Sequence, residues 1–348
     1  TCALPIYINT GMENREKSKR IKNKSEKNRK EFTMRYKHFK NADVKVSCLA
    51  VGTWAIGGKN YGPVDREGSI RAIRRMVDLG VNLIDTAPCY GNGTAEKIVG
   101  EAIRTIPRDK ILLSTKFGLV PDVFKGDFRK EATYKNAMRE VESSLMNLDT
   151  DYIDFYFVHW PDVNTPICET MSALADLKRM GKIRYVGVSN FTQEQIEEAE
   201  KYLTVDVQQP PFSMVERQYE QLMSWGASRG IDSMTYGSMG AGILSGKYRD
   251  TPDFEPGDLR LTFYDYFREP KFSKIQELLK TMDEIAGEHN CPVSQVALNW
   301  STQKDFVGTA LVGVRSEAHA DENCAAFAWE LSEAEILRLD NELERLGL

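Results

Sequence analysis

The chain has 348 residues, an apolar share of 41% and a formal net charge of −5. This acidic balance argues against general nucleic-acid binding, and the sequence has no run of about 18 apolar residues that would predict a membrane span. The six cysteines are scattered without a C-x-x-C pair. They predict neither a disulfide framework nor a metal site, and they suit the reducing cytoplasm, where we expect the protein to reside.

The first 33 residues differ from the rest of the chain. They contain nine Lys or Arg and four Asp or Glu, and almost no apolar residues follow Met12. A segment of this kind cannot bury a core, so we expect residues 1–33 to be a disordered basic leader. Met34 begins a segment typical of a natural start, and Lys30-Glu31 can be encoded as AAGGAG, which resembles a ribosome-binding site. We therefore expect residues 1–33 to be read-through from upstream sequence; binding to an acidic partner is the alternative, and a secretory signal lacks its apolar region.

Beyond residue 45 the sequence alternates short apolar runs with amphipathic stretches. Strands that are buried on both faces of a parallel sheet have this β-branched and aromatic composition. The eight predicted strands are 47–54, 82–87, 111–116, 152–160, 184–190, 205–209, 231–237 and 309–314.

Helical periodicity fills the intervals between these runs. The predicted helices are Ser69–Leu79, Thr94–Arg104, Ala132–Leu148, Glu169–Met180, Gln193–Leu203 and Ser273–His289, with a terminal helix at Leu331–Leu346. The residues from Asn190 to Thr192 include N-cap candidates for the fifth helix. Gly181 and Gly230 stand where C-terminal glycines are expected.

Eight strand-helix units in residues 34–348 predict a single-domain (β/α)8 TIM barrel of the α/β class, and an open doubly wound sheet is the alternative. The irregular stretch from Lys247 to Lys271 follows the seventh strand. In a barrel it would overhang the C-terminal ends of the strands, where the active sites of this fold lie.

Polar residues stand at or just beyond the ends of most of these apolar strands. Each one alone has a structural interpretation, as a helix cap, a core residue with a satisfied hydroxyl or a surface ion pair. Together they would converge on one rim of a barrel, where charges are costly unless they are paired and used. They are Asp85, Tyr90, Lys116, His159, Ser189, Asn190, Gln209 and Tyr236.

Several motifs in a fixed order resemble the aldo-keto reductase family over residues 34–348. They are NLIDTAPCYGNGTAE (82–96), LLSTKFG (112–118), DYIDFYFVHWPD (151–162), GKIRYVGVSNF (181–191), VDVQQPPFSMVER (205–217), TYGSMGAGILSGKY (235–248) and GVRSEAHADEN (313–323). The GDLR run at 257–260 is similar to the bacterial branch that includes inositol-operon and general stress reductases. The resemblance implies an oxidoreductase that reduces an aldehyde or a ketone, sugars included, with a nicotinamide cofactor.

The resemblance also assigns a catalytic tetrad. Tyr90 would be the general acid, although a phenol with its ordinary pKa of ~10 is a poor acid at neutral pH. Lys116 would supply an ammonium that lowers the pKa of that phenol, and Asp85 would hold the ammonium in place. His159 would orient the substrate carbonyl and help to relay the proton. No metal is required.

The resemblance places the nicotinamide end of the cofactor among residues on several strand ends. Ser189, Asn190 and Gln209 would bind its carboxamide and Tyr236 would stack on the ring, with Gln208 competing for the role of Gln209. Thr53 and Trp54 would also contact the cofactor. The pyrophosphate would meet Gly237, Ser238, Met239, Gly242 and Lys247; the family commonly has Pro at the position of Ser238, so this loop could differ in shape.

The adenine end would lie at the start of the last barrel helix. Gly313 and Arg315 open this helix, and a guanidinium suits a 2′-phosphate, which favours NADP(H) over NAD(H). His319 stands where the family often has Arg or Gln and would loosen that preference toward dual use. Glu322 and Asn323 would contact the adenine.

The substrate pocket is predicted to be lined by Trp54, Tyr90 and Trp160 together with the loop after the seventh strand. Cys89 beside Tyr90 is either a packing residue or a site of oxidation. The run Gly91–Glu96 follows a strand and opens a helix like a dinucleotide-binding turn, but it lacks the third glycine of that motif.

Two other functions remain open at this point: a cofactor-binding sensor or scaffold without catalysis, and a barrel isomerase or lyase. The sequence names no physiological substrate and does not decide whether the chain forms a homo-oligomer.

Overall fold

The computed structural model describes residues 33–58, 64–122, 127–255 and 258–348. The predicted leader and read-through segment therefore lie outside the described residues, except for Thr33. Met34–Leu348 form one compact unit.

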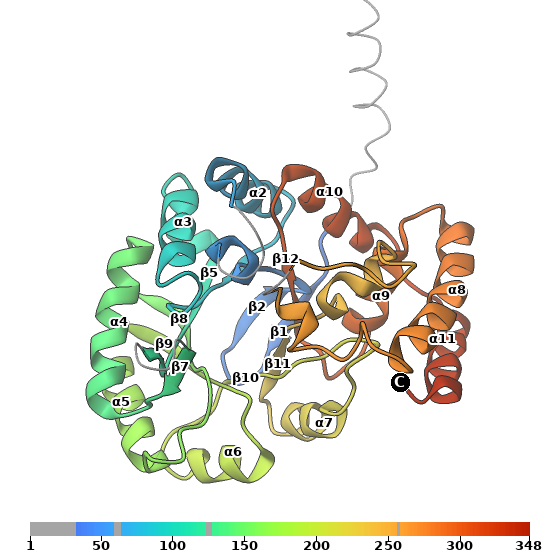
Figure 1. Ribbon diagram of the computed structural model, residues 1–348. Helices are drawn as coiled ribbons and strands as arrows, with labels where there is room; N and C mark the ends of the chain where they lie inside the picture. The colour runs from blue at the N-terminus through green and yellow to red at the C-terminus, as the bar shows by residue number, and fades with distance from the viewer. Residues whose placement is uncertain (1–32, 59–63, 123–126, 256–257) are drawn as a thin grey trace, which may run out of the picture. The chain divides into compact units, whose positions relative to one another are not determined.

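Eight parallel strands close into a barrel, as the sequence predicts (Figure 1). The alternative of an open doubly wound sheet is wrong, because the last strand pairs with the first in register, Ala310 opposite Leu49. In barrel order the strands are β3 (Leu49–Gly52), β4 (Leu83–Asp85), β5 (Leu112–Phe117), β8 (Ile153–Val158), β9 (Ile183–Ser189), β10 (Val207–Gln209), β11 (Asp232–Thr235) and β12 (Thr309–Gly313).

Helices surround the strands, and two further helices pack together outside the ring (Figure 1). The surrounding helices are α2 (Arg66–Asp78), α3 (Thr94–Ile103), α4 (Tyr134–Leu148), α5 (Ile167–Arg179), α6 (Gln193–Glu200), α7 (Glu220–Ser228), α9 (Val293–Thr302) and α10 (Glu317–Ala325). The outer pair is α8 (Lys271–His289) and α11 (Glu333–Leu346). Short 3-10 turns are η1 (Trp54–Gly57), η2 (Arg108–Lys110), η3 (Gly240–Ser245), η4 (Leu259–Leu261) and η5 (Ala326–Ala328).

The predicted helices agree with the structure to within a few residues, but α7 and α9 were not predicted. All ten residues of α9 are buried, so its sequence has no polar face to produce helical periodicity. The predicted helix ends are confirmed at three places. Thr192 caps α6 in a reciprocal capping box with Gln195, and Gly181 and Gly230 adopt the left-handed conformation with φ of 73° and 83°.

An antiparallel hairpin of β1 (Tyr36–Phe39) and β2 (Val44–Ser47) covers the N-terminal end of the barrel. Its Phe39 and Val46 are fully buried and share one core cluster with the barrel residues Phe155 and Val207. This end is filled with apolar side chains, so polar chemistry is confined to the opposite, C-terminal end of the strands. A second hairpin, β6 (Leu119–Asp122) with β7 (Asp127–Lys130), follows β5 at that end.

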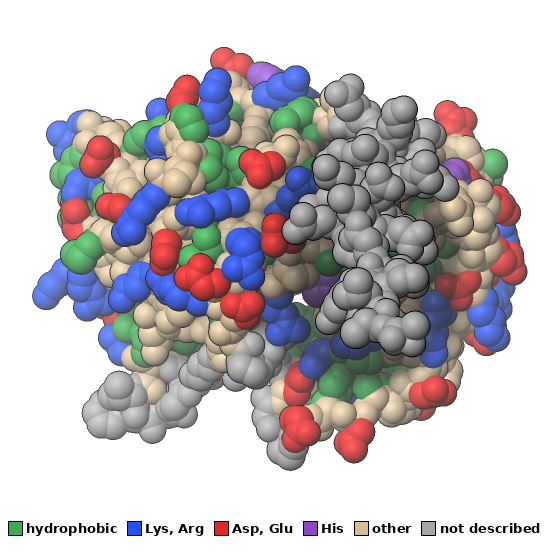
Figure 2. Space-filling model, turned by 90° about the horizontal axis from the view of Figure 1, so that it is seen from above, with side chains coloured by type: hydrophobic (Ala, Val, Ile, Leu, Met, Phe, Trp, Pro, Cys, Tyr) green, Lys and Arg blue, Asp and Glu red, His purple; other side chains and the backbone are tan. Residues whose placement is uncertain are grey.

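Lys and Arg side chains alternate with Asp and Glu over the face in Figure 2. The two signs of charge are interspersed there, so the described side chains of this face form no extended field of one sign. Within the described ranges, no helix is both long enough and apolar enough to cross a membrane.

Candidate active site

The predicted acid–base residues meet at the C-terminal ends of β4 and β5. Lys116 Nζ lies 2.7 Å from Asp85 Oδ2 and donates a second hydrogen bond of 2.9 Å to the Thr86 carbonyl. The same ammonium lies 3.4 Å from Tyr90 Oη. The Lys116 side chain is fully buried, so these oxygens compensate a charge that has no access to water.

Asp85 receives two more donors inside the barrel. Ser114 Oγ donates to Asp85 Oδ1 at 2.7 Å, and Gln209 Nε2 donates to the same oxygen at 3.1 Å. Ser114 is not among the site residues predicted from the sequence. Side chains two residues apart in a strand share a face, so the spacing of Ser114 and Lys116 in the LLSTK run is the signal that could have identified it.

A close approach of two loops fixes the position of Tyr90. Gly57 at the end of η1 lies directly against the backbone of Tyr90 and Gly91, and a Cβ on Gly57 would come within 2.6 Å of the Tyr90 carbonyl carbon. Gly91 has a left-handed φ of 64°, and a Cβ there would clash with the Gly57 carbonyl. Gly57 and Gly91 therefore allow the two loops to pack closely against each other. The glycine at the start of the 91–96 run serves this loop contact in a closed barrel, which differs from the dinucleotide-binding turn of an open sheet.

His159 follows β8 directly and faces Tyr90, with ring centroids 6.1 Å apart in an edge-to-face arrangement. Its backbone N–H donates to the Phe117 carbonyl at 3.0 Å. Its Nδ1 lies 3.6 Å from Cys89 Sγ. Burial, and secondly the nearby Lys116 ammonium, hold the pKa of His159 well below its usual value, so the imidazole is neutral near pH 7.

The residues predicted for the nicotinamide end lie together across β9, β10 and β11. Ser189 Oγ donates to the Gln209 carbonyl at 2.8 Å, and Tyr236 Oη donates to Asn190 Oδ1 at 2.9 Å. Asn190 Nδ2 in turn donates to the His159 carbonyl at 3.0 Å, which connects this group to the tetrad.

The two candidate glutamines point in different directions. Gln209 donates to Asp85 inside the barrel. Gln208 instead lies against Gly226 and the Leu222 carbonyl of α7, on the outside. Neighbouring residues of a strand alternate between its faces, so Gln209 is the one on the side of the tetrad.

The loop after β11 contains several residues with a left-handed backbone conformation (positive φ), three of them consecutive. They are Gly237, Gly240, Ala241, Gly242 and Gly246. The N–H groups of Gly240, Gly242 and Gly246 donate to the carbonyls of Gly237, Met239 and Ile243, so these residues fold the loop back on itself. A Cβ at Gly237 would meet no atom of the described residues within 4 Å. Ser238 stands where the family commonly has Pro. Its Oγ donates to the Thr235 carbonyl at 3.4 Å, which ties the start of the loop to the end of β11. Met239 is half-buried, and Lys247 is exposed at the end of the loop.

The end of β12 leads into α10 within four residues. Gly313 and Arg315 are exposed, and Ser316 caps the helix by accepting a hydrogen bond from the His319 N–H. His319 and Glu322 are exposed on α10, and Glu322 accepts a hydrogen bond of 2.7 Å from Ser294 Oγ. Asn323 is half-buried on the next position of the same helix.

These two strand ends combine open space with positive charge. Among the described residues, a Cβ on Gly237 or Gly313 would meet no atom within 4 Å, and the exposed Lys247 and Arg315 add cations. Positive charge beside accessible backbone suits a phosphate. The described residues therefore fit a pyrophosphate-containing cofactor.

An aromatic wall stands next to Tyr90. Trp54 is roughly parallel to Tyr90 with ring centroids 6.2 Å apart, and it meets the edge of Phe263 at 6.3 Å. Thr53, the residue before Trp54, is buried and donates to the Asp85 carbonyl at 2.9 Å. Trp160 lies against the β6–β7 hairpin, with Lys130 Nζ 4.8 Å from its ring centroid.

Phe263 belongs to the long loop after β11. The sequence predicts that this loop lines the substrate pocket, but it does not single out Phe263. Arg260 holds the loop together: it donates to Asp258 Oδ1 at 2.8 Å and to Tyr248 Oη, and it lies 4.2 Å above the Phe254 ring. Arg260 and Asp258 belong to the GDLR run, whose Gly257 lies outside the described residues.

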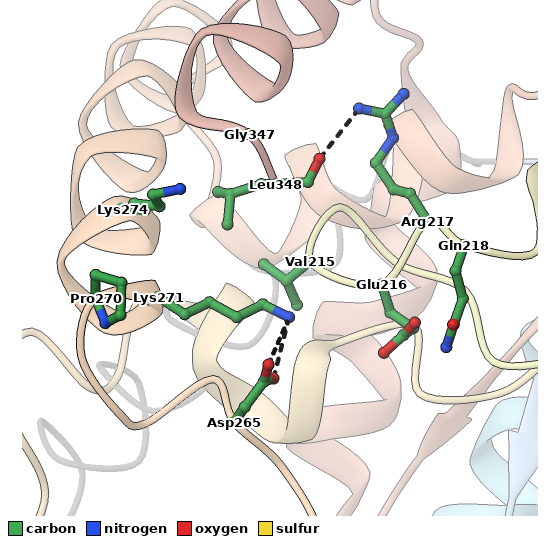
Figure 3. A pocket seen from close by; sticks show the side chains of 10 residues that line it. All are labelled: Val215, Glu216, Arg217, Gln218, Asp265, Pro270, Lys271, Lys274, Gly347 and Leu348. Carbon is green, nitrogen blue, oxygen red and sulfur yellow. Dashed lines mark hydrogen bonds and ion pairs between the residues drawn. The ribbon is translucent and has the colours of Figure 1, made fainter.

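A cavity of about 610 Å³ lies away from the tetrad, between the start of α8, the end of α11 and the loop after β10 (Figure 3). Its Lys271 is paired with Asp265 at 3.0 Å, and its Arg217 donates to Glu220 at 2.8 Å. None of the predicted catalytic or cofactor residues lines it. The predicted site residues therefore lie at the strand ends, apart from this cavity.

Comparison with known proteins agrees with this geometry. The model of the aldo/keto reductase family matches residues 48–344. The chain therefore belongs to the aldo-keto reductase family and is an oxidoreductase that acts on carbonyl compounds.

Two curated relatives match over nearly their whole length. The chain is 35% identical over 314 residues to the aldo-keto reductase YhdN of Bacillus subtilis, covering 89% of this chain and 94% of that protein. It is 33% identical over 318 residues to the NADH-specific methylglyoxal reductase of Escherichia coli, covering 87% and 97%. These bacterial relatives are in line with the bacterial branch expected from the motifs.

Solved structures of the same family superpose on the barrel. The glycerol dehydrogenase AKR11B4 from Gluconobacter oxydans has a TM-score of 0.81 at 32% identity, covering 91% of this chain and 96% of that chain. An aldo/keto reductase from Klebsiella pneumoniae, in complex with NADP and acetate, has a TM-score of 0.69 at 27% identity, covering 89% and 95%.

Proposed function

We propose that this enzyme reduces a small aldehyde or ketone to the alcohol, with Tyr90 as the proton donor and NADP(H) preferred over NAD(H). The observation that carries the proposal is the position of the Lys116 ammonium. It is held between Asp85 Oδ2 and the Thr86 carbonyl and lies 3.4 Å from Tyr90 Oη.

Tyr90 protonates the substrate oxygen in this proposal. The buried Lys116 ammonium stabilises the phenolate that remains after proton transfer, because an opposite charge nearby favours the ionised form. Asp85 keeps the ammonium in position and is itself fixed by Ser114 and Gln209. The strength of the acid therefore comes from contacts that are already made within the protein.

His159 orients the carbonyl. Its ring faces Tyr90 edge-on, and its lowered pKa keeps it neutral, so it contributes a hydrogen bond without adding a second positive charge beside Lys116. A neutral imidazole has one N–H to donate. The carbonyl oxygen is thus placed between the phenol of Tyr90 and the imidazole.

The bound cofactor supplies the hydride. Ser189, Asn190 and Gln209 would hold its carboxamide, Tyr236 would lie on its ring, and the loop 237–247 would hold the pyrophosphate. Arg315 supports the preference for NADP(H), since a guanidinium matches a phosphate with two parallel hydrogen bonds. The similar Klebsiella structure contains NADP, whereas the similar Escherichia coli enzyme is NADH-specific. Titration with both NADPH and NADH measures the preference directly.

The proposed substrate is a small carbonyl compound. Trp54, Phe263 and Tyr90 make one aromatic wall, which suits a short carbon skeleton, and Trp160 would complete the pocket on the side of the β6–β7 hairpin. Methylglyoxal and glycerol appear in the names of similar proteins and are the first compounds to assay. A sensor that binds the cofactor without catalysis is the competing function.

The test is steady-state turnover, followed by NADPH absorbance, for the unmodified chain and for Tyr90→Phe. Loss of the general acid is expected to lower kcat by about 100-fold to 10,000-fold, with NADPH binding retained. Tyr202→Phe is the matched control, because Tyr202 is 51% exposed and its hydroxyl donates to Glu198, far along the chain from the tetrad.

Unchanged turnover in Tyr90→Phe would remove Tyr90 as the acid. Tight NADPH binding without turnover on any aldehyde or ketone would favour the sensor.

A further inference from the structure

The contact between Cys89 and His159 joins two strand-end loops of the active site. Cys89 precedes Tyr90 in the loop after β4, and its Sγ lies 3.6 Å from Nδ1 of His159. In the described part of the chain, Nδ1 is the only ring nitrogen of His159 with a hydrogen-bonding partner. A sulfur atom at this distance is within reach of an S–H hydrogen bond.

The protonation states of the two groups decide the direction of this bond. His159 is neutral because burial and Lys116 lower its pKa, and Cys89 is a thiol because burial raises its pKa to about 12. A neutral imidazole has one protonated and one unprotonated nitrogen. The unprotonated nitrogen is a strong acceptor, whereas a thiol sulfur is a weak one.

We propose that Cys89 is a positioning residue that donates its S–H to Nδ1 of His159 and thereby holds the imidazole in the tautomer with the proton on Nε2. The Nε2–H is then the donor to the substrate carbonyl oxygen. The opposite tautomer would direct its N–H at sulfur and offer the substrate a lone pair, which cannot bind a carbonyl oxygen. This inference rests on the proposed function, because it uses the carbonyl as the acceptor.

The same burial argues against Cys89 as a site of oxidation. The thiolate is the reactive form of cysteine, and a thiol with a pKa near 12 contributes little thiolate at neutral pH. The thiol proton is therefore retained and available for His159.

The first measurement is the tautomer itself. The full chain is labelled with ¹⁵N-histidine, and the His159 resonances are assigned by comparison with His159→Gln. The unmodified protein is expected to show a protonated Nε2 and an unprotonated Nδ1. Cys89→Ser keeps a donor and should keep this pattern, whereas Cys89→Ala should move the resonances toward a mixture of the two tautomers.

The second measurement is kinetic. Cys89→Ala should lower kcat by about threefold to tenfold, the equivalent of one neutral hydrogen bond, with KM nearly unchanged, and Cys89→Ser should restore most of the loss. Cys324→Ala is the matched control: it removes a buried thiol that contacts Met76 Sδ, and it should change neither the tautomer nor kcat.

The proposal is overturned if the unmodified protein has the proton on Nδ1, or if Cys89→Ala leaves the tautomer ratio unchanged. Neither outcome depends on turnover. Conversely, full activity of Tyr90→Phe would remove the proposed acid and leave the measured tautomer standing, so the two failures can be told apart.

Discussion

The two sides of the barrel rim are built in different ways. At the ends of β4, β5 and β8, Asp85, Lys116 and His159 are bound to other protein groups, and Lys116 is fully buried. At the ends of β11 and β12, the chain presents left-handed backbone and exposed side chains such as Arg315 and Lys247. We refer to these as the acid–base wall and the cofactor wall.

Under the proposed function, this difference corresponds to two roles of the rim. The groups proposed to act on the reacting atoms are fixed in advance by internal contacts, since preorganised dipoles need no rearrangement during a reaction. The groups proposed to bind the cofactor keep open backbone and long side chains at the surface. Substitutions in the acid–base wall should therefore lower kcat, and those in the cofactor wall should lower cofactor affinity.

The largest effect is expected for Lys116→Met. Without the ammonium, kcat should fall by about 100-fold to 10,000-fold, while NADPH affinity changes little. Asp85 would lose its partner in the buried site, so the free energy of unfolding should fall by about 3–5 kcal/mol. Denaturant unfolding and saturating kinetics measure the two effects separately.

The double variant Asp85→Asn, Lys116→Met tests the reason for the instability. It should recover much of the lost stability, because no carboxylate is left without its partner, but it should recover no activity. A large loss of NADPH affinity in Lys116→Met would break the division between the two walls.

Arg315→Ala probes the cofactor wall. Charged hydrogen bonds contribute about 1.5–3 kcal/mol, so the Kd for NADPH should rise about tenfold to 100-fold, with NADH little affected. Arg179→Ala, on the exposed end of α5, is the control. Fluorescence titration gives both Kd values, and an equal loss for NADH would place Arg315 away from the 2′-phosphate.

The neutral, buried state of His159 should be visible in the pH dependence of stability. Its pKa is lowered well below the unfolded value of about 6.5, so below that pH the unfolded chain binds a proton that the folded chain does not. Stability should therefore fall as the pH drops below about 6.5, by up to about 1.4 kcal/mol per pH unit from this residue. His159→Gln should flatten that part of the curve; an unchanged slope would show that His159 takes up its proton at the same pH in the folded and unfolded chains.

Gly313→Ala is expected to give the smallest effect. A Cβ there would meet no atom of the described residues within 4 Å, so stability should be almost unchanged. If the cofactor lies against this strand end, the Kd for NADPH should rise about fivefold, the equivalent of one hydrogen bond. Gly287→Ala in α8 is the matched control, since a Cβ there also meets nothing; unchanged affinity in both variants would move the cofactor away from Gly313.

Much of the fold could be predicted, because each barrel strand is a short apolar run and most helices have one polar face. The elements that were missed lack these signals. Helix α9 is buried on all sides, and hairpin strands such as β1 (YKHF) and β6 (LVPD) mix polar with apolar residues and are only partly buried.

The candidate site was predictable to the extent that its residues stand at strand ends. Asp85, Lys116 and His159 follow apolar runs directly, and the parallel barrel brings such positions to one rim. Ser114 was predictable from its spacing but was overlooked. Phe263 could be assigned only to a loop, because the path of an irregular segment depends on contacts such as those of Arg260.

The sequence by itself determined the succession of strands and helices and the set of polar residues at the strand ends, since these follow from local periodicity and from chain connectivity. Only the tertiary structure decided that the sheet closes, through the pairing of Ala310 with Leu49, and which of those polar residues touch. The choice of Gln209 over Gln208, the three contacts of the Lys116 ammonium and the Cys89–His159 pair join residues far apart in the chain. Such contacts depend on the packing of one strand end against another, and no local pattern in the sequence encodes the distance between them.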